Sequence, residues 1–390
     1  DPWTPGATGS YNITVYSQLA TDSDLSNDTL NKSTTAFNEL PNYGWTSKTS
    51  AAIATFGGAS AFIPSVNAPL DSGYLFSDGG SDLSIIQPKN ERFDEMTNNW
   101  TSATDMPIGV YQFSMHGIQN MMYAIGGYSS GFVPSPTNYI YNPQTNSWTS
   151  GAVMPQPVGD YASGIYNDSL IYFIGGYDGT NDLNTVQIYN PATDSWSMGT
   201  PKPGTAVSGF RGGIYNNFIV VTCGYSQTLQ DAIDETWIGQ IDPANPTSIV
   251  WQAAAPYPGG TMTRFAGGGT FKNSLPYVVF AAGDPTGVGT EVKDDVWAYD
   301  LNNNEWLVGP PKPTACSNVS NFTGVVSNDS LYMVVVGGYN GVGTTGANEW
   351  LNLGASPFVG VKELSSQLVV AVSPNPVSDI LTVQIPSPLE

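Results

Sequence analysis

The chain repeats one pattern six times, with a period of roughly 50 residues. In each copy an apolar run closes on a glycine pair or a variant of one, and in five copies a tryptophan follows in register. A period of this length is typical of solenoids, propellers and arrays, so one large repeat domain is expected. The paired positions are Gly79-Gly80, Gly126-Gly127, Gly175-Gly176, Cys223-Gly224, Ala282-Gly283 and Gly337-Gly338. The tryptophans are Trp100, Trp148, Trp196, Trp251 and Trp306.

Each copy predicts four antiparallel strands. Segments such as MMYAIGGYSS and NYIYNPQTNSWTS alternate apolar and polar residues between turn sequences, and a further strand precedes each glycine pair. An aromatic residue stands seven positions before the tryptophan in four copies, which is the spacing of a hairpin with a constant turn. Glycine pairs suit strand ends where φ is positive or the backbone is crowded. The spaced aromatic residues are Phe93, Tyr141, Tyr189 and Tyr299.

These features resemble the kelch repeat family. The resemblance rests on the glycine doublets, the Tyr177-Asp178-Gly179 after one of them, the spaced aromatic residue and the tryptophan, over roughly residues 36–355. It implies an all-β fold, a six-bladed kelch-type β-propeller with four-stranded blades around a central channel.

The last copy lacks a tryptophan strand. Trp350 follows the last glycine pair by only 12 residues, against 20 to 27 in the other copies, so it is expected on a third strand, like Trp237 and Trp297. Trp45 stands upstream of the first copy with no place in it. We therefore expect residues 40–48 to complete the last blade, so that an N-terminal strand closes the ring and leaves no open edge.

Both ends of the chain lie outside the repeat. Residues 1–35 are an N-terminal extension, residues 36–358 the propeller and residues 359–372 a linker. Residues 373–390 resemble the start of the type IX secretion C-terminal sorting domain of Bacteroidota, the alternative being a plain hairpin with a proline-rich turn. The matching residues are Ser373-Pro374-Asn375-Pro376, Ser378-Asp379 and Leu381-Thr382-Val383.

That resemblance implies export, a secreted or outer-membrane surface location, and the type IX secretion machinery as a partner. Three Asp-Ser/Thr-Leu triplets also resemble the O-glycosylation pattern of Bacteroidota, which makes Thr29, Ser169 and Ser330 predicted glycosylation sites.

Charge and cysteine content exclude several classes of function. Lysine plus arginine number 11 against 32 acids, a formal net charge of −21, and no basic cluster exists, so nucleic acid and anionic membranes are poor partners. The acidic surface suits a soluble secreted protein, with cation binding as the alternative. No apolar stretch reaches the roughly 18 residues of a transmembrane segment. Cys223 and Cys316 are expected as free or buried thiols, the alternative being a bridge between two blades.

No cofactor, metal or catalytic residue is assigned. Copper galactose oxidases use this kind of propeller but need two histidine ligands and a Tyr–Cys pair, and His116 is the single histidine here. It is expected to face the channel. No zinc spacing, phosphate loop or nucleophile elbow appears, while paired carboxylates for glycoside cleavage are left open.

Candidate ligand-binding residues gather where the loops after the glycine pairs and the proline-rich loops after the tryptophans should meet on one face. The tyrosines would ring this face and stack on a sugar or grip a peptide, and the arginines, on inner strands, would lie deeper and could hold a carboxylate. The alternative is structural, with tyrosines that belong to the repeat and arginines paired to acids. These residues are Tyr128, Tyr177, Asp178, Tyr225, Asp284, Tyr339, Arg211 and Arg264.

The sequence favours a secreted or cell-surface binding or adhesion module, for a glycan or a protein, and a role other than catalysis. One alternative is a carbohydrate-active enzyme, resembling a sialic acid mutarotase or a lyase, with Arg211 or Arg264 in the channel. The other is a structural subunit of an extracellular assembly joined through its terminal strands.

Overall fold

The structure is a computed structural model that describes residues 9–16, 29–42, 44–64, 73–270, 274–287, 291–319, 321, 323–327 and 330–355. Up to residue 35 it describes the backbone alone. Its regular elements are strands. These ranges contain no helix, and hence no helix that is long and apolar enough to cross a membrane. The predicted linker (359–372) and C-terminal segment (373–390) fall outside the described residues.

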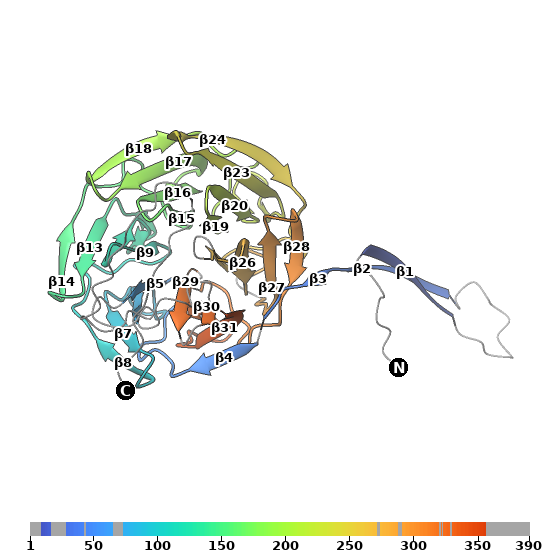
Figure 1. Ribbon diagram of the computed structural model, residues 1–390, viewed down its shortest axis with the longest axis horizontal. Coiled ribbons are helices and arrows are strands. Elements are labelled where there is room, and N and C mark those ends of the chain that lie inside the picture. The colour runs from blue at the N-terminus through green and yellow to red at the C-terminus, as the bar shows by residue number, and fades with distance from the viewer. Residues whose placement is uncertain are drawn as a thin grey trace, which may run out of the picture.

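Six sheets, antiparallel except where β3 joins one of them, surround a central axis in chain order, like the blades of a propeller (Figure 1). This confirms the predicted all-β, six-bladed architecture. From the inner strand outward, blade 1 holds β5 (Ala59–Pro64), β6 (Gly73–Asp78), β7 (Asn90–Asp94) and β8 (Asn99–Ser102). Blade 2 holds β9 (Ser114–Ile118), β10 (Met121–Ile125), β13 (Asn138–Asn142) and β14 (Ser147–Ser150). Blade 3 holds β15 (Ala162–Tyr166), β16 (Leu170–Tyr177), β17 (Asp182–Asn190) and β18 (Ser195–Gly199).

The remaining blades follow the same order. Blade 4 holds β19 (Arg211–Tyr215), β20 (Phe218–Thr222), β23 (Thr236–Asp242) and β24 (Asn245–Ala254). Blade 5 holds β25 (Ala266–Gly269), β26 (Tyr277–Ala281), β27 (Val296–Asp300), β28 (Glu305–Val308) and β3 (Asn38–Glu39). Blade 6 holds β29 (Thr323–Ser327), β30 (Ser330–Val336), β31 (Asn348–Ala355) and β4 (Trp45–Lys48). Beyond the glycine pairs, two blades carry short hairpins, β11 (Tyr128–Ser129) with β12 (Val133–Pro134) and β21 (Tyr225–Ser226) with β22 (Asp231–Ala232).

The seven-residue spacing is explained by cross-strand pairs. Tyr141 on β13 lies directly opposite Trp148 on β14, with ring centroids 4.9 Å apart. Equivalent pairs, such as Tyr189 with Trp196, recur in blades 1, 3 and 5. Cross-strand aromatic pairs stabilise a hairpin beyond the area that they bury.

The glycine pair or its variant directly follows the second strand in five blades and lies inside β16 of blade 3, and its residues have positive φ values. Gly127 has a φ of 82°, and a Cβ atom there would lie 2.7 Å from the carbonyl oxygen of Tyr111 in the loop that leads to the inner strand. Cys223 and Ala282 replace the first glycine of their pairs and keep its conformation, with φ values of 64° and 66°. The pair is therefore a backbone requirement at the contact between adjoining segments.

The N-terminal segment closes the propeller across two blades. As expected from Trp45, β4 pairs antiparallel with β31, where Thr46 faces Trp350. The preceding β3 pairs parallel with β28 and adds a fifth strand to blade 5, which the sequence did not predict. Before it, β1 (Gly9–Tyr16) and β2 (Thr29–Ala36) form a separate antiparallel hairpin, drawn beside the disc in Figure 1.

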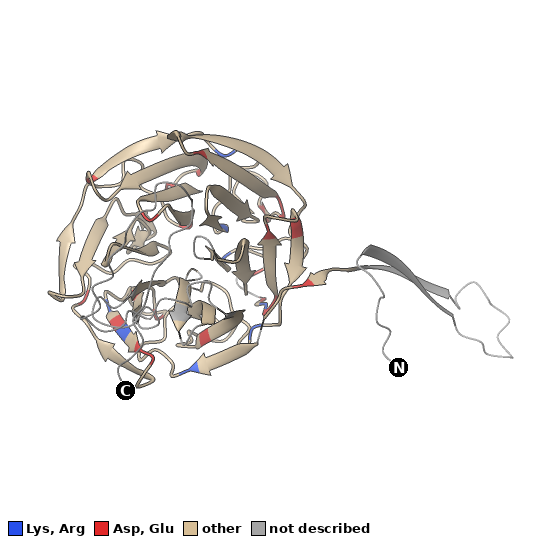
Figure 2. Cartoon of the chain, in the orientation of Figure 1, with Lys and Arg blue, Asp and Glu red and all other residues tan. Residues whose placement is uncertain are grey.

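Charged residues are thinly spread over the described blades. Lysine and arginine positions do not gather in any one blade (Figure 2). The described part of the chain therefore has no basic patch of the kind that nucleic-acid binding requires.

Candidate functional site

A closed ring of backbone hydrogen bonds crosses the face that carries the glycine pairs. One residue from each blade, in the segment that leads to the inner strand, donates its N–H to the carbonyl of the equivalent residue in the preceding blade, at N···O distances of 2.6 to 3.0 Å. All six residues have left-handed φ values between 50° and 65°. This mouth ring consists of Gly57, Gln112, Asp160, Gly209, Arg264 and Asn318.

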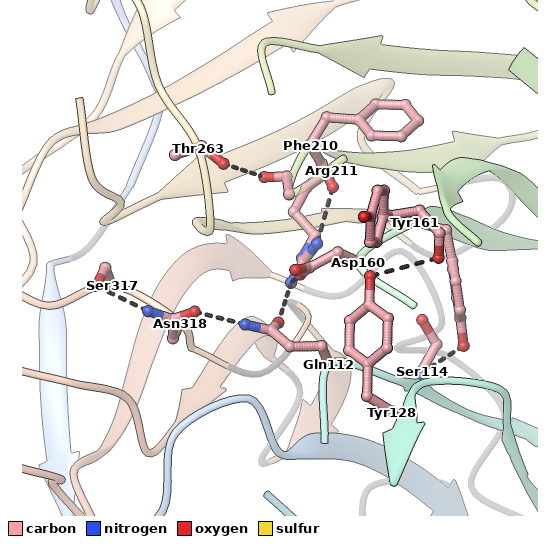
Figure 3. A network of polar contacts seen from close by, with 12 residues as sticks. Gln112, Ser114, Tyr128, Asp160, Tyr161, Phe210, Arg211, Thr263, Ser317 and Asn318 are labelled. Carbon is pink, nitrogen blue, oxygen red and sulfur yellow. Dashed lines mark hydrogen bonds and ion pairs between the residues drawn. The ribbon is translucent and has the colours of Figure 1, made fainter. Parts of the chain in front are cut away.

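Side chains of the mouth ring form a polar network over the channel (Figure 3). The guanidinium of Arg211, the first residue of β19, donates from Nη2 to Oε1 of Gln112 at 3.1 Å and lies 3.6 Å from Oδ1 of Asp160. The amide of Gln112 donates in turn to Asn318, whose own amide donates to Ser317 at 3.2 Å. Arg211, which the sequence predicts to lie deep in the channel, therefore links blades 2, 3 and 4 through these contacts.

Asp160 is the acid of this network. Its side chain is 13% exposed, and its Oδ1 is buried without a hydrogen-bond partner. Burial raises the pKa of the Asp160 carboxyl above its ordinary value, while the charges of Arg211 and Arg264 oppose the rise.

A cavity of about 810 Å³ opens above the mouth ring. Its floor is polar and its walls come from the loops after the glycine pairs of blades 1 and 2, together with the loop that leads into β9. These two kinds of loop meet on one face, as predicted. The floor residues are Gln112, Asp160, Arg264 and Asn318.

One wall of the cavity is aromatic. The rings of Tyr111, Tyr128 and Phe132 lie within 6.2 Å of one another, centroid to centroid. Tyr111 and Tyr128 are buried, whereas Phe132 is 70% exposed at the tip of the β11–β12 hairpin. Burial raises the pKa of both tyrosine hydroxyls, so each stays protonated near neutral pH. Phe132 is thus the exposed aromatic surface of this wall.

Apolar side chains stand at the rim. Leu83 and Ile85, from the loop after the glycine pair of blade 1, are 61% and 58% exposed and line the cavity. Leu83 has a φ of 75° and Phe132 a φ of 59°. A left-handed backbone costs a bulky residue roughly 1–2 kcal/mol, and such strain is found at functional sites. The rim therefore holds two apolar side chains in a conformation that the fold itself does not favour.

Three of the eight predicted ligand residues line this cavity: Tyr128, Tyr177 and Arg264. Arg211 lies beneath them in the network. Tyr128 forms part of the wall but is only 3% exposed, because its ring packs on Gly159.

The other four predicted residues are not among the lining residues. Asp178 holds its own loop, accepting from the N–H groups of Thr180 and Asn181, and the fully buried Asp284 accepts from Thr286 and Gly287. The Tyr225 ring packs against Gly287, and Tyr339 forms a β-bridge with Ser317. Two of the predicted glycosylation sites, Ser169 and Ser330, are half-buried, while the Thr29 side chain falls outside the description.

Several cavity residues were missed by sequence reasoning. Gln112, Asp160 and Asn318 hold equivalent positions ahead of the inner strands, and four of the six residues at these positions are polar. Tyr111 immediately precedes one of these positions, and Phe132 lies in an insertion, SSGFVP, after a glycine pair. Comparison of the copies at the start of the inner strand would have found the floor.

The far end of the channel holds a smaller cavity of about 150 Å³. His116 faces it, as predicted, and its Nε2 lies 2.9 Å from Oγ of Ser163. Burial lowers the pKa of His116 to about 4, so the ring is neutral at physiological pH. The inner strands are close together here, since a Cβ atom on Gly213 would lie 2.1 Å from the backbone of Gly269.

The described ranges contain neither a metal-binding cluster nor a disulfide. No group of three or more His, Cys, Asp or Glu side chains there could hold a metal ion. Cys223 and Cys316 are both buried free thiols, so the alternative of a bridge between blades is not realised.

Comparison with known proteins agrees with this architecture. The Kelch motif family model matches residues 110–155 and 161–203, which correspond to blades 2 and 3. A solved structure titled "Structure of YjhT" matches with a TM-score of 0.61 and 15% sequence identity, over 86% of this chain and 99% of that chain. At this identity the likeness shows the fold alone. No curated protein matches the chain.

Proposed function

We propose that this kelch-type propeller is a binding module whose ligand occupies the cavity above the mouth ring. The observation that carries the proposal is a cavity of about 810 Å³ with an aromatic wall and a polar floor. Ligand sites in proteins have this form, mostly apolar with a few fixed polar groups, at volumes of roughly 300–1,000 Å³.

A neutral or weakly polar glycan fits this lining best. Sugars present C–H faces that pack on an aromatic ring, and hydroxyl groups that pair with planar polar side chains. Phe132 supplies an exposed ring, and the floor supplies amide, carboxylate and guanidinium groups. The two charges among the described lining residues, Asp160 and Arg264, are of opposite sign, so the cavity has no net charge to favour an ionic ligand.

The lining supports binding over glycoside hydrolysis. Hydrolysis of this kind uses two carboxylic acids that flank the scissile bond. Among the described residues that line the cavity, Asp160 is the one carboxylic acid. Arg211, a candidate of the enzyme alternative, already uses its guanidinium to bind Gln112 and the carbonyl of Phe210.

A polypeptide ligand is the second candidate, and the exposed rim favours it. Leu83, Ile85 and Val133 are each more than half exposed on two neighbouring loops. Contiguous apolar patches of this kind often mark protein interaction sites.

The proposed setting is outside the cell. Export through the type IX machinery, surface location and O-glycosylation rest on the sequence resemblances given above. Assembly through the terminal strands is a further proposal, to which the separate β1–β2 hairpin lends support, since a two-stranded hairpin alone is marginally stable.

A glycan array with purified protein tests the proposal, using Phe132→Ala and Val250→Ala as a matched pair. Both side chains are 70% exposed, but Val250 lies on the outer strand of blade 4. Phe132→Ala should weaken binding at least tenfold while Val250→Ala leaves it unchanged. If Phe132→Ala binds glycans as well as the unchanged chain does, the glycan binds at another site. Peptide binding that requires Leu83 would favour the second candidate.

A further inference from the structure

The amide groups of the cavity floor are already occupied. Gln112 donates its Nε2 hydrogen to Asn318 and accepts from Arg211 at Oε1. Asn318 accepts that bond and donates to Ser317. These two amides therefore hold the floor in place, and their hydrogen bonds to one another and to their neighbours leave little capacity for a ligand.

Asp160 differs from these amides because its carboxylate is paired with Arg211 by charge but accepts no hydrogen bond from the described residues. Its Oδ1 is buried and accepts no hydrogen bond, and the nearest cation, Nη2 of Arg211, lies at 3.6 Å, beyond hydrogen-bond distance. A buried acceptor without a donor is unfavourable, and most are satisfied in native structures by protein, water or ligand. Oδ1 itself is closed to solvent, but the Asp160 side chain is 13% exposed and lines the cavity, so a donor on the ligand would meet the carboxylate at its other oxygen, Oδ2.

Arg264 brings a donor to the same floor. Its Nη1 donates to the carbonyl of Gly287 at 3.1 Å, and its side chain is 34% exposed, so the guanidinium also meets the cavity. Gly209 stands between Asp160 and Arg264 in the mouth ring and has no side chain. A Cβ atom on Gly209 would lie 2.2 Å from Oγ1 of Thr263, so this gap is built into the packing.

We propose that Asp160 determines the specificity of the cavity by accepting a hydrogen bond from a ligand hydroxyl, while Arg264 donates to a neighbouring oxygen of the same ligand. The inference rests on the proposed function and names its substrate class, which is a neutral polyol such as a sugar with adjacent hydroxyl groups. A diol offers a donor and an acceptor on neighbouring carbons, which matches one carboxylate and one guanidinium across a gap.

The same geometry disfavours two related ligands. A deoxy sugar that lacks the hydroxyl leaves Asp160 unsatisfied, and sites built around a polar group reject analogues that lack it. An acidic sugar at this position places a second carboxylate beside that of Asp160, which is repulsive where water is excluded.

The test uses the full chain, with methyl glucoside, methyl galactoside, methyl mannoside and their monodeoxy analogues as probes. Saturation-transfer NMR identifies the glycosides that bind, and titration gives their dissociation constants. Asp160→Asn should weaken the best glycoside roughly tenfold, since a charge-assisted bond to a hydroxyl is lost. Asp178→Asn is the matched control, because it makes the same charge change on the same face outside the lining residues and should leave affinity unchanged.

Asp160 also faces Arg211, so thermal melting must show that Asp160→Asn still folds. If that variant does not fold, the inference is still tested by comparing the affinities of the wild-type chain for each glycoside and its deoxy analogues. One deoxy analogue should bind at least tenfold more weakly than its parent, and Asp160→Asn should reduce that difference.

Equal affinity for every deoxy analogue and its parent, or unchanged affinity in a folded Asp160→Asn protein, would overturn the inference. If Phe132→Ala abolishes glycoside binding while Asp160→Asn does not alter it, the glycan-binding function stands and the role of Asp160 is wrong. If none of the glycosides binds, both are wrong.

Discussion

The indole N–H of Trp45 donates a 2.9 Å hydrogen bond to the carbonyl of Pro310, a residue 265 positions later in the chain. The five repeat tryptophans make the same contact with the outer loop of the preceding blade, as Trp148 does with the carbonyl of Thr104 at 2.7 Å. Trp45 therefore occupies the sixth place in a circle of equivalent contacts, between blades 5 and 6.

We expect this contact to anchor the closure of the ring. Trp45→Ala removes a half-buried indole and its hydrogen bond, and should lower the free energy of unfolding by about 2–4 kcal/mol. Trp45→Phe keeps most of the apolar contact and should cost only about 1 kcal/mol. Chemical denaturation measures both changes.

Two truncations provide the control. Removal of residues 1–36 leaves β3 and β4 in place and should leave the stability of the propeller almost unchanged. Removal of residues 1–48 deletes both strands and should cost more than Trp45→Ala. Equal stability of the two truncated proteins would show that the N-terminal strands do not close the ring.

Much of the fold could be predicted because its aromatic residues and glycine pairs recur at regular intervals along the sequence. The spacing of seven positions from Tyr141 to Trp148 is a property of the hairpin, and the short interval before Trp350 marks the missing strand. By contrast, β3 contributes two residues to a parallel pair and has no periodicity to detect.

The candidate site was only partly predictable, because its floor depends on backbone conformation. Gln112 and Arg264 take left-handed φ values that neither residue type favours, so the local sequence does not indicate the mouth ring. Tyr128 was expected at an open face, yet it is buried against Gly159. Asp178 was expected to meet ligand, but short polar side chains after a turn commonly bond to their own loop, as this one does.

The glycine pairs should resist substitution for two separable reasons. At Gly176, φ is 93° and a Cβ atom would lie 2.7 Å from the carbonyl oxygen of Gly159. At Gly131, φ is 78° and no atom lies within 4 Å of that position. Gly131→Ala should therefore cost about 1 kcal/mol for the backbone alone, and Gly176→Ala about 2–5 kcal/mol, by denaturant unfolding. Equal costs would mean that crowding at the glycine pair contributes nothing.

His116 should make the fold sensitive to acid. Its pKa is lowered to about 4 in the folded chain, whereas an unfolded histidine has a pKa of about 6.5. Between these two values the unfolded chain binds a proton that the folded chain does not, so this residue lowers stability as the pH falls from about 6.5 to about 4, by up to about 3 kcal/mol. Above pH 6.5 it has no effect.

Comparison of the wild type with His116→Gln isolates this contribution. Burial raises the pKa of Asp160 and Asp78, so these folded-state acids bind protons first and change stability in the opposite direction on acidification. As the pH falls from 7 to 4, the wild type should therefore lose more unfolding free energy than His116→Gln, because only the wild type carries the histidine. A difference that does not vary with pH would show that the pKa of His116 is the same in the folded and unfolded chains.

Leu83 should separate stability from binding. It is 61% exposed and holds a φ of 75°, so the fold gains little from its side chain and bears the cost of its backbone. Asparagine tolerates this conformation far better, and Leu83→Asn should raise the free energy of unfolding by about 0.5–1 kcal/mol. Because the same side chain lines the cavity, the variant should bind ligand at least several-fold more weakly.

Val342→Asn, at a 91% exposed loop residue outside the lining residues, is the control for loss of an exposed apolar group and should leave binding intact. Calorimetry and titration of the three proteins measure both effects, and a Leu83→Asn protein that is less stable yet binds normally would mean that Leu83 serves the fold rather than the ligand.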